Sequence, residues 1–482
     1  MKQANMAAST DNILEISASI AGILNEKHKP EHLQVLKTFT AALRDEEYRD
    51  AVEEEMFSTF LKVLMRLCEE LQAAGTDGED LQSSTLELQL SAECFRAQRN
   101  ACVQSTRNQS LQLGFIDLIL ADLLNGLSDV GSFFCGSALR CGIQFLGNLA
   151  VGNQLCKDEI WRISFPDLFL QLLSTDDEKV VNYTSMVIHT CLDEDKVEDL
   201  SKPQNIQLAL RVMELCRTQP ELDWTVLIAT QHFLRSLSLV ENMYSEMSHH
   251  DRVTLVELLL AQLREEGSED CGIPPSVARF LATSFQQGCG AVLTLATGSV
   301  LQEALAVISL LDVLCEMTSD HKQFMFLQDH PDLLATTVEL LEQVHATGKA
   351  SKNIFSAAQN FSSFSGDGDP SSYSPVISFK AHLIRLIGNL CHSNTNNQNK
   401  VRELEGIPLI LDNCNIDSNN PFISQWAIFT IRNLLEHNSD NQTLIASLER
   451  CGTADYSALR ELGFLVEERD GTLLLKPVRK DS

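Results

Sequence analysis

Glycine, proline and aromatic residues are all scarce in this sequence. Glycine occurs 23 times and proline 12 times among 482 residues, roughly 5% and 2.5% against an average usage of about 7% and 5%. Aromatic residues make up only 6%, although β-sheets are usually rich in aromatic and β-branched side chains. Because helix-breaking residues are few, the composition favours helices packed on helices. Hydrophobic residues at 44% exclude a wholly disordered chain.

Basic residues and long apolar runs are also lacking. The chain has 37 Lys+Arg against 66 Asp+Glu, a formal net charge of -29. A surface of this sign repels phosphate, so binding to nucleic acid or to an anionic membrane is disfavoured. No stretch approaches the ~18 uninterrupted apolar residues of a membrane span, and the N-terminal segment lacks the regions of a signal peptide. We therefore expect an intracellular soluble protein without membrane insertion.

Motifs of catalysis and metal binding are missing as well. Fourteen cysteines occur without a C-x-x-C pair, as in reducing compartments where a buried cysteine serves as a small hydrophobe. There is no G-x-S-x-G and no phosphate-binding glycine loop. His28 and His32 are four residues apart, but Pro30 between them and the lack of a third ligand nearby argue against a metal site. We predict no catalytic residue, metal or cofactor, and no enzymatic activity.

An internal repeat is present instead. In each copy an apolar helical stretch carries an asparagine near its end, followed by a polar turn and an Asn-Gln pair. The pair comes eight residues after the asparagine in three copies, and five residues after it at Asn148. A period in the forties with two or three helices is typical of armadillo and HEAT repeats. The predicted fold is all-α, an armadillo/HEAT-like right-handed superhelical solenoid. The repeated asparagines are Asn100, Asn148, Asn389 and Asn433.

Other segments refine this pattern. Phe165–Ser174 has apolar residues at helical spacing directly after a proline-containing turn, which predicts a helix that begins near Pro166. Residues 351–377 are rich in Ser, Gly and Asp and predict a loop insertion between repeats. Gly463–Val478 predicts a short C-terminal β-hairpin around Asp470-Gly471.

The sequence His382–Cys391 (HLIRLIGNLC), continued by Val401–Ile445, resembles the C-terminal domain of the ataxin-10 family. Similar stretches occur upstream, among them Arg140–Ala150 (RCGIQFLGNLA), so the resemblance extends over nearly everything after about Ser84. We divide the chain into a helical region over 1–83, an armadillo-like array over 84–350, the insertion over 351–377 and the C-terminal ataxin-10-like domain over 378–478.

The resemblance implies a non-catalytic interaction scaffold or adaptor. It implies roles in neuronal survival, in neurite outgrowth through Ras–MAP kinase signalling, and in cytokinesis. The implied partners are a G-protein β subunit and O-GlcNAc transferase, together with self-association through the C-terminal domain. The implied location is cytoplasmic and perinuclear, with the centrosome, the basal body of the cilium or the midbody as further sites.

The repeated asparagines leave two interpretations open. They could hydrogen-bond an extended peptide in a groove, which would make the protein a peptide-cargo or transport receptor. They could instead end their own helices through local hydrogen bonds. In armadillo import receptors a tryptophan four residues earlier forms slots for basic cargo, and its absence here disfavours that function. The position holds Arg96, Gln144, Arg385 and Phe429, of which we include Arg385 with the four asparagines as a candidate groove residue.

Overall fold

The computed structural model divides into two compact units, Met1–Glu246 and Met247–Ser482. The structure describes residues 19–20, 22–76, 85–118, 132–264, 272–297, 301–319, 322–357, 376–415, 417–448, 464–469 and 472–477. Among the helices in these ranges, none combines the length and the apolar character that crossing a membrane requires.

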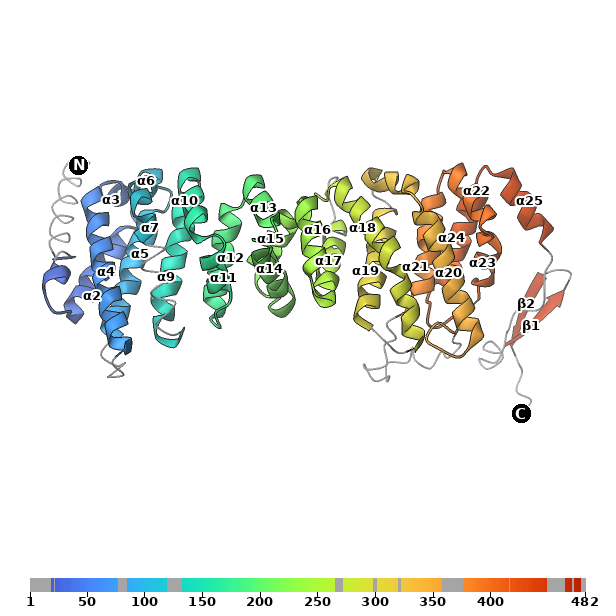
Figure 1. The fold of residues 1–482 in the computed structure, drawn as a ribbon, viewed down its shortest axis with the longest axis horizontal. Helices are drawn as coiled ribbons and strands as arrows, with labels where there is room; N and C mark the ends of the chain where they lie inside the picture. Colours follow the sequence, from blue (N-terminus) through green and yellow to red (C-terminus); the bar gives the residue numbers. More distant parts are fainter. Residues whose placement is uncertain are drawn as a thin grey trace. The chain divides into compact units, whose positions relative to one another are not determined.

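The first unit is built of helices that follow one another side by side in chain order (Figure 1). One row of helices, α2, α5, α9, α12 and α15, makes contacts from each member to the next, and the other helices pack beside this row. The elements are α2 (Pro30–Ala42), α3 (Glu46–Asp50), α4 (Glu54–Thr76), α5 (Thr85–Ala101), α6 (Thr106–Gln112), η1 (Leu113–Phe115), α7 (Ile116–Leu118), α9 (Ser132–Ala150), α10 (Gln154–Ser164), α11 (Asp167–Leu173), α12 (Glu178–Cys191), α13 (Glu194–Ser201), α14 (Ile206–Thr218), α15 (Asp223–Gln231), η3 (Phe233–Arg235) and α16 (Leu237–Glu246).

The second unit repeats the same arrangement, with α17, α19, α21 and α24 in contact in that order. Its elements are α17 (His249–Leu263), α18 (Pro275–Gly288), η4 (Cys289–Thr297), α19 (Leu301–Met317), η5 (Lys322–Asp329), α20 (Leu333–Ala350), α21 (Phe379–Cys391), α22 (Thr395–Glu403), α23 (Gly406–Asp412), α24 (Ile423–Leu435), α25 (Ser439–Ser447), β1 (Phe464–Arg469) and β2 (Thr472–Pro477). The helical repeat architecture that the sequence predicts is therefore present in each unit.

Strands β1 and β2 pair antiparallel, with Phe464 opposite Pro477 and Arg469 opposite Thr472. The predicted turn residues Asp470 and Gly471 lie outside the described residues, as do residues 358–375 of the predicted insertion. The predicted boundary between residues 83 and 84 also lies outside them. Upstream of it, α2 and α4 both pack on α5, so the N-terminal helices belong to the same array.

Local sequence explains why these helices begin and pack as they do. Asp177 caps α12 by accepting hydrogen bonds from the backbone N–H groups of Lys179 and Val180. The same carboxylate accepts from Arg140 on α9, with Nε and Oδ2 2.8 Å apart. Helix α11 begins after Pro166, as predicted. Its apolar residues at helical spacing are all buried, and they are Leu168, Phe169, Leu172 and Leu173.

The core also takes up most of the described cysteines. These are free thiols, and all of them are buried except Cys289 and Cys414, which are half-buried. The sequence-based prediction that the cysteines act as small buried hydrophobes is confirmed for this group.

Helices α21 and α24 approach each other closely at Gly388. A methyl group added there would lie 3.1 Å from the ring of Phe429 and would overlap the hydroxyl of Thr430. That hydroxyl is already fixed, because it donates to the Ile384 carbonyl at 2.8 Å. A glycine is needed here for the contact between the two helices.

We predict that Gly388→Ala lowers the free energy of unfolding by about 1–3 kcal/mol, because the methyl group overpacks this contact. The measurement is chemical denaturation followed by circular dichroism. Gly290→Ala is the matched control, since nothing lies within 4 Å of a methyl group there. Equal stability of the two variants would contradict the close approach.

Candidate protein-interaction site

Each repeated asparagine donates its side-chain N–H to the backbone of the preceding helix in the row. The accepting carbonyl is 45 to 74 residues away in sequence, so none of these bonds is local. The four bonds run from Asn100 to Thr40 at 3.0 Å, from Asn148 to Arg99 at 3.1 Å, from Asn389 to Cys315 at 3.1 Å and from Asn433 to Gly388 at 3.0 Å.

The accepting carbonyls all belong to the last turn of a helix. The last four carbonyl groups of an α-helix have no partner within the helix. Arg99 lies two residues before the end of α5, and Gly388 three residues before the end of α21. The asparagines therefore cap helices, as one interpretation of the sequence proposed, but the helix that each one caps is the preceding one and not its own.

The C-terminal end of α21 shows the complete arrangement. Five consecutive carbonyl groups, the last four of α21 and that of His392, each accept a hydrogen bond from a side-chain amide. Gln328 belongs to the preceding repeat and Asn433 to the next one, whereas Asn397 and Gln398 lie on α22, directly after α21. The pairs are Gly388 with Asn433 at 3.0 Å, Asn389 with Gln328 at 3.1 Å, Leu390 with Asn397 at 2.8 Å, Cys391 with Gln398 at 3.3 Å and His392 with Gln328 at 2.9 Å. The Asn-Gln pair of the sequence repeat is the source of two of these amides.

The repeat copy at Asn148 has the same eight-residue spacing as the other copies, so the five-residue spacing given by the sequence analysis is wrong. Asn153 caps α10 by accepting from the N–H of Cys156, as Asn394 caps α22. Cys156 therefore occupies the place that Asn397 has in α22. Its thiol donates to the Gln109 carbonyl at 3.7 Å, and because burial raises the pKa of Cys156 to about 11, the sulfur keeps its proton.

The solvent exposure of the four asparagine side chains determines whether a ligand could reach their amides. Asn433 is 0% exposed and Asn389 is 4% exposed, whereas Asn100 and Asn148 are half-buried. In the first pair the amide is packed between two helices. Use of the four asparagines as peptide-binding groups remains a prediction.

Arg385, the other candidate groove residue, connects three helices of the row. Its guanidinium carbon lies 4.8 Å from the centroid of the Trp426 ring on α24, which is cation–π distance. It also pairs with Glu316 on α19, with Nη2 and Oε2 3.4 Å apart. The arginine thus stacks against one neighbouring helix and forms an ion pair with the other.

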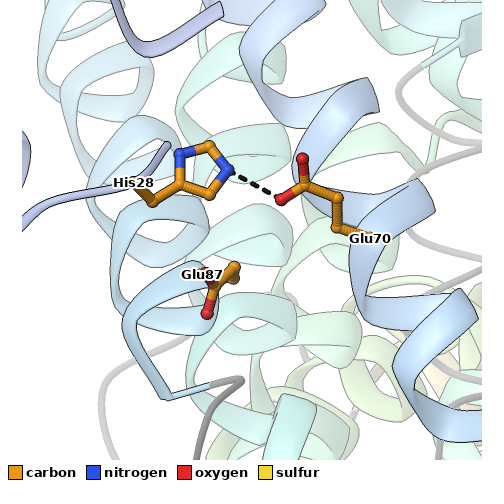
Figure 2. Close-up of side chains that lie close together, drawn as sticks. All are labelled: His28, Glu70 and Glu87. Atoms are coloured by element: carbon orange, nitrogen blue, oxygen red, sulfur yellow. Dashed lines mark hydrogen bonds and ion pairs between the residues drawn. The ribbon is translucent and has the colours of Figure 1, made fainter. Parts of the chain in front are cut away.

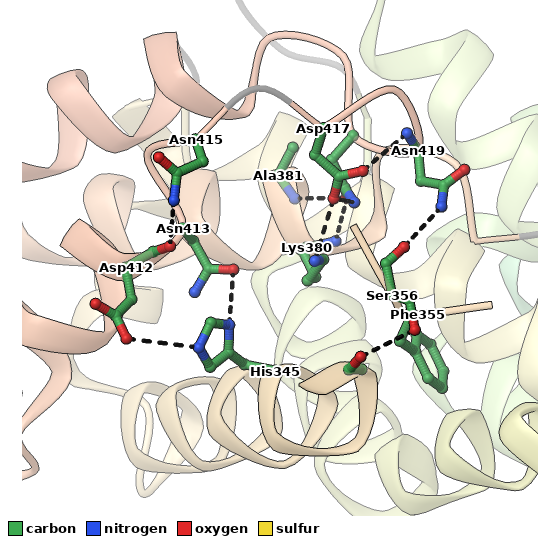
Figure 3. Close-up of polar contacts among 12 residues, drawn as sticks. His345, Phe355, Ser356, Lys380, Ala381, Asp412, Asn413, Asn415, Asp417 and Asn419 are labelled. Carbon is green, nitrogen blue, oxygen red and sulfur yellow. Dashed lines mark hydrogen bonds and ion pairs between the residues drawn. The ribbon is translucent and has the colours of Figure 1, made fainter. Parts of the chain in front are cut away.

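The N-terminal end of α21 is capped from the loop that follows α23. Asn420 Oδ1 accepts from the backbone N–H of Lys380 at 2.9 Å and of Ala381 at 3.3 Å. Nearby, Lys380 Nζ and Asp417 Oδ2 form a buried ion pair at 3.1 Å, visible in Figure 3. Helix α21 is thus held at both ends by side chains of the next repeat.

A cavity of about 140 Å³ lies beside this ion pair. On its wall, His345 Nδ1 is 3.1 Å from Asn413 Oδ1 (Figure 3). Lys349 pairs with Asp412 at 3.2 Å. Burial lowers the pKa of His345, which favours the neutral imidazole. Because the charged groups of the wall are paired with one another, the cavity presents no free charge of either sign from these residues.

Two exposed apolar side chains lie at α24, Phe422 directly before its first residue and Ile428 on the helix, and together we call them the end face. Their exposed fractions are 70% and 68%. Thr430 and Asn433 of the same helix bond to α21, so Ile428 points away from α21. Among the described residues no further helix of the row follows α24. The sequence analysis missed this surface, although Ile428 is out of register with the buried Ala427 and Leu434.

Comparison with known proteins gives the family. Residues 379–476 match the family model described as the spinocerebellar ataxia type 10 protein domain. Ataxin-10 of Xenopus tropicalis is 43% identical over 445 residues, which cover 91% of this chain and 90% of that protein. The chain belongs to the ataxin-10 family. Ataxin-10 of Homo sapiens is 40% identical over 458 residues, covering 93% and 94% of the two proteins.

Other similarities are narrower or more distant. The ataxin-10 homolog of Dictyostelium discoideum is 48% identical over 103 residues, 21% of this chain and 17% of its own length. A solved structure from work on the interaction between cadherin and beta-catenin has a TM-score of 0.35 and 12% identity, covering 86% of this chain and 89% of that chain. The part that matches the ataxin-10 family model begins at α21 and includes the end face and the capping residues of α21 other than Gln328.

We predict that Asn433→Ala lowers the free energy of unfolding by about 1–3 kcal/mol, because the buried Gly388 carbonyl loses its donor. Denaturant titration of the intact chain measures the change. The matched control is Asn396→Ala, since Asn396 is exposed on α22. An Asn433 variant as stable as the control would show that the capping bond contributes nothing.

Proposed function

We propose that this ataxin-10 family protein is a non-catalytic scaffold that binds other proteins and self-associates through the end face on α24. The observation that supports self-association is the exposure of Phe422 and Ile428, at 70% and 68%. Both lie within the 379–476 segment that matches the family model, and that model carries homo-association in its name.

The way in which repeats bury their apolar faces gives a physical reason to expect self-association. Each repeat buries its apolar faces only against its neighbours, and a terminal repeat stays soluble when its outer face is polar. The outer side of α24 is only partly polar, because Ile428 is exposed there between the exposed Gln425 and Arg432. A second copy of the chain that packs against this side would cover it as a following repeat would.

The test is the mass of the intact chain in solution, measured by light scattering over a wide concentration range. We expect masses above 53.6 kDa for the wild type, and a return to 53.6 kDa for Ile428→Asp, because a buried unpaired carboxylate opposes association. Val151→Asp is the matched control, since Val151 is 59% exposed in the first unit.

Two results would overturn the self-association proposal. One is a wild-type mass of 53.6 kDa at every concentration. The other is equal association of the Ile428 and Val151 variants, which would place the contact elsewhere. Circular dichroism confirms beforehand that both variants remain helical.

The finer roles implied by the family are part of the proposal. They are neurite outgrowth and neuronal survival through Ras–MAP kinase signalling and cytokinesis, with a G-protein β subunit and O-GlcNAc transferase as partners. The proposed location is cytoplasmic and perinuclear, including the centrosome, basal body or midbody. The alternative, a peptide-cargo receptor, is less well supported, because Asn389 and Asn433 are buried and already donate to neighbouring helices.

A further inference from the structure

Three side chains with metal-binding chemistry meet in the N-terminal part of the first unit. His28 precedes α2, Glu70 lies on α4 and Glu87 lies in the first turn of α5 (Figure 2). Each offers one ligand atom, and the three atoms all lie within 4.8 Å of one another. The group is not evident from the sequence, because no third ligand lies close to His28 and His32 along the chain and Glu70 is 42 residues from His28.

The site is half-buried and has unsatisfied polar atoms. The His28 side chain is only 5% exposed, and its Nε2 lies 2.7 Å from Glu70 Oε2. Glu87 Oε2 is buried and has no hydrogen-bond partner among the described residues. A buried carboxylate oxygen without a donor is costly, and two neighbouring carboxylates repel each other. A cation between the three groups would relieve both costs.

Arg66 leaves this arrangement intact. Its Nε donates to Glu70 Oε1 at 2.8 Å, and its Nη1 donates to the Ile23 carbonyl at 2.9 Å. The arginine therefore holds one oxygen of Glu70 and leaves Oε2 directed toward His28. Hydrogen bonds of this kind from outer residues commonly orient metal ligands.

The geometry points to a binding site for a divalent transition-metal ion of the Zn²⁺ class, formed by His28, Glu70 and Glu87. An imidazole with two carboxylates suits Zn²⁺, whereas Ca²⁺ and Mg²⁺ prefer ligand sets made of oxygen alone. The ion would join the segment before α2 to α4 and α5. Its role is structural, since it ties together the first helices of the array.

The probes are Zn²⁺ by isothermal titration calorimetry and Co²⁺ by absorption spectroscopy, both with the intact, reduced chain. We expect one ion per chain and a cobalt spectrum without thiolate charge-transfer bands, which excludes binding by cysteine. Zn²⁺ should also raise the melting temperature, because it binds the folded state.

Two variants test the ligands separately. His28→Gln and Glu87→Gln should each weaken Zn²⁺ binding by at least about 100-fold, since even changes to outer residues cost about 10–100-fold. Glu87→Gln keeps the size of the side chain, so its helical content in chelator should match the wild type. His250→Gln is the matched control, because His250 is exposed on α17.

Three outcomes would overturn the proposal. The first is no saturable binding of either ion by the wild type. The second is binding that survives both ligand substitutions. The third is thiolate bands in the cobalt spectrum with one ion bound, which would assign the ion to cysteines.

Discussion

The unpaired carbonyl oxygens at helix C-termini are the constraint on which this structure depends. Every α-helix leaves its last four carbonyl groups without an internal partner, and in an array of packed helices these groups lie at the contacts between repeats. At the end of α21, side-chain amides satisfy four such carbonyls and that of the next residue, His392. The following helix α22 supplies some of these amides, and the repeats on either side supply the others.

The same exchange operates in both units. Gln109 donates to the carbonyls of Asn148 and Val151 at the end of α9, as Gln398 donates to those of Asn433 and Glu436 at the end of α24. Each repeat therefore supplies donors to the next helix and receives them from it. The amides used in this way are committed to the fold, which directs the search for partner-binding surfaces to the end face on α24 and to other exposed side chains.

Sequence periodicity predicted the helices, the start of α11 after Pro166 and the special position of the repeated asparagines, because these features depend on residues close in the chain. It did not reveal which helix each asparagine caps, since the acceptor lies one repeat away. The position of the Asn-Gln pair also gave a wrong alignment for the repeat copy at Asn148, because a cysteine thiol there takes the place of the asparagine amide. Arg385 stacked on Trp426 and the group of His28, Glu70 and Glu87 depend likewise on contacts between distant segments.

Hydrogen exchange of Asn389→Ala tests whether each repeat is stabilised by amides of its neighbour. The Asn389 side chain bonds to the Cys315 carbonyl on α19. We expect faster amide exchange in the last turn of α19 as well as in α21, because the substitution removes a bond that joins them. Faster exchange confined to α21, with α19 unchanged, would contradict this expectation.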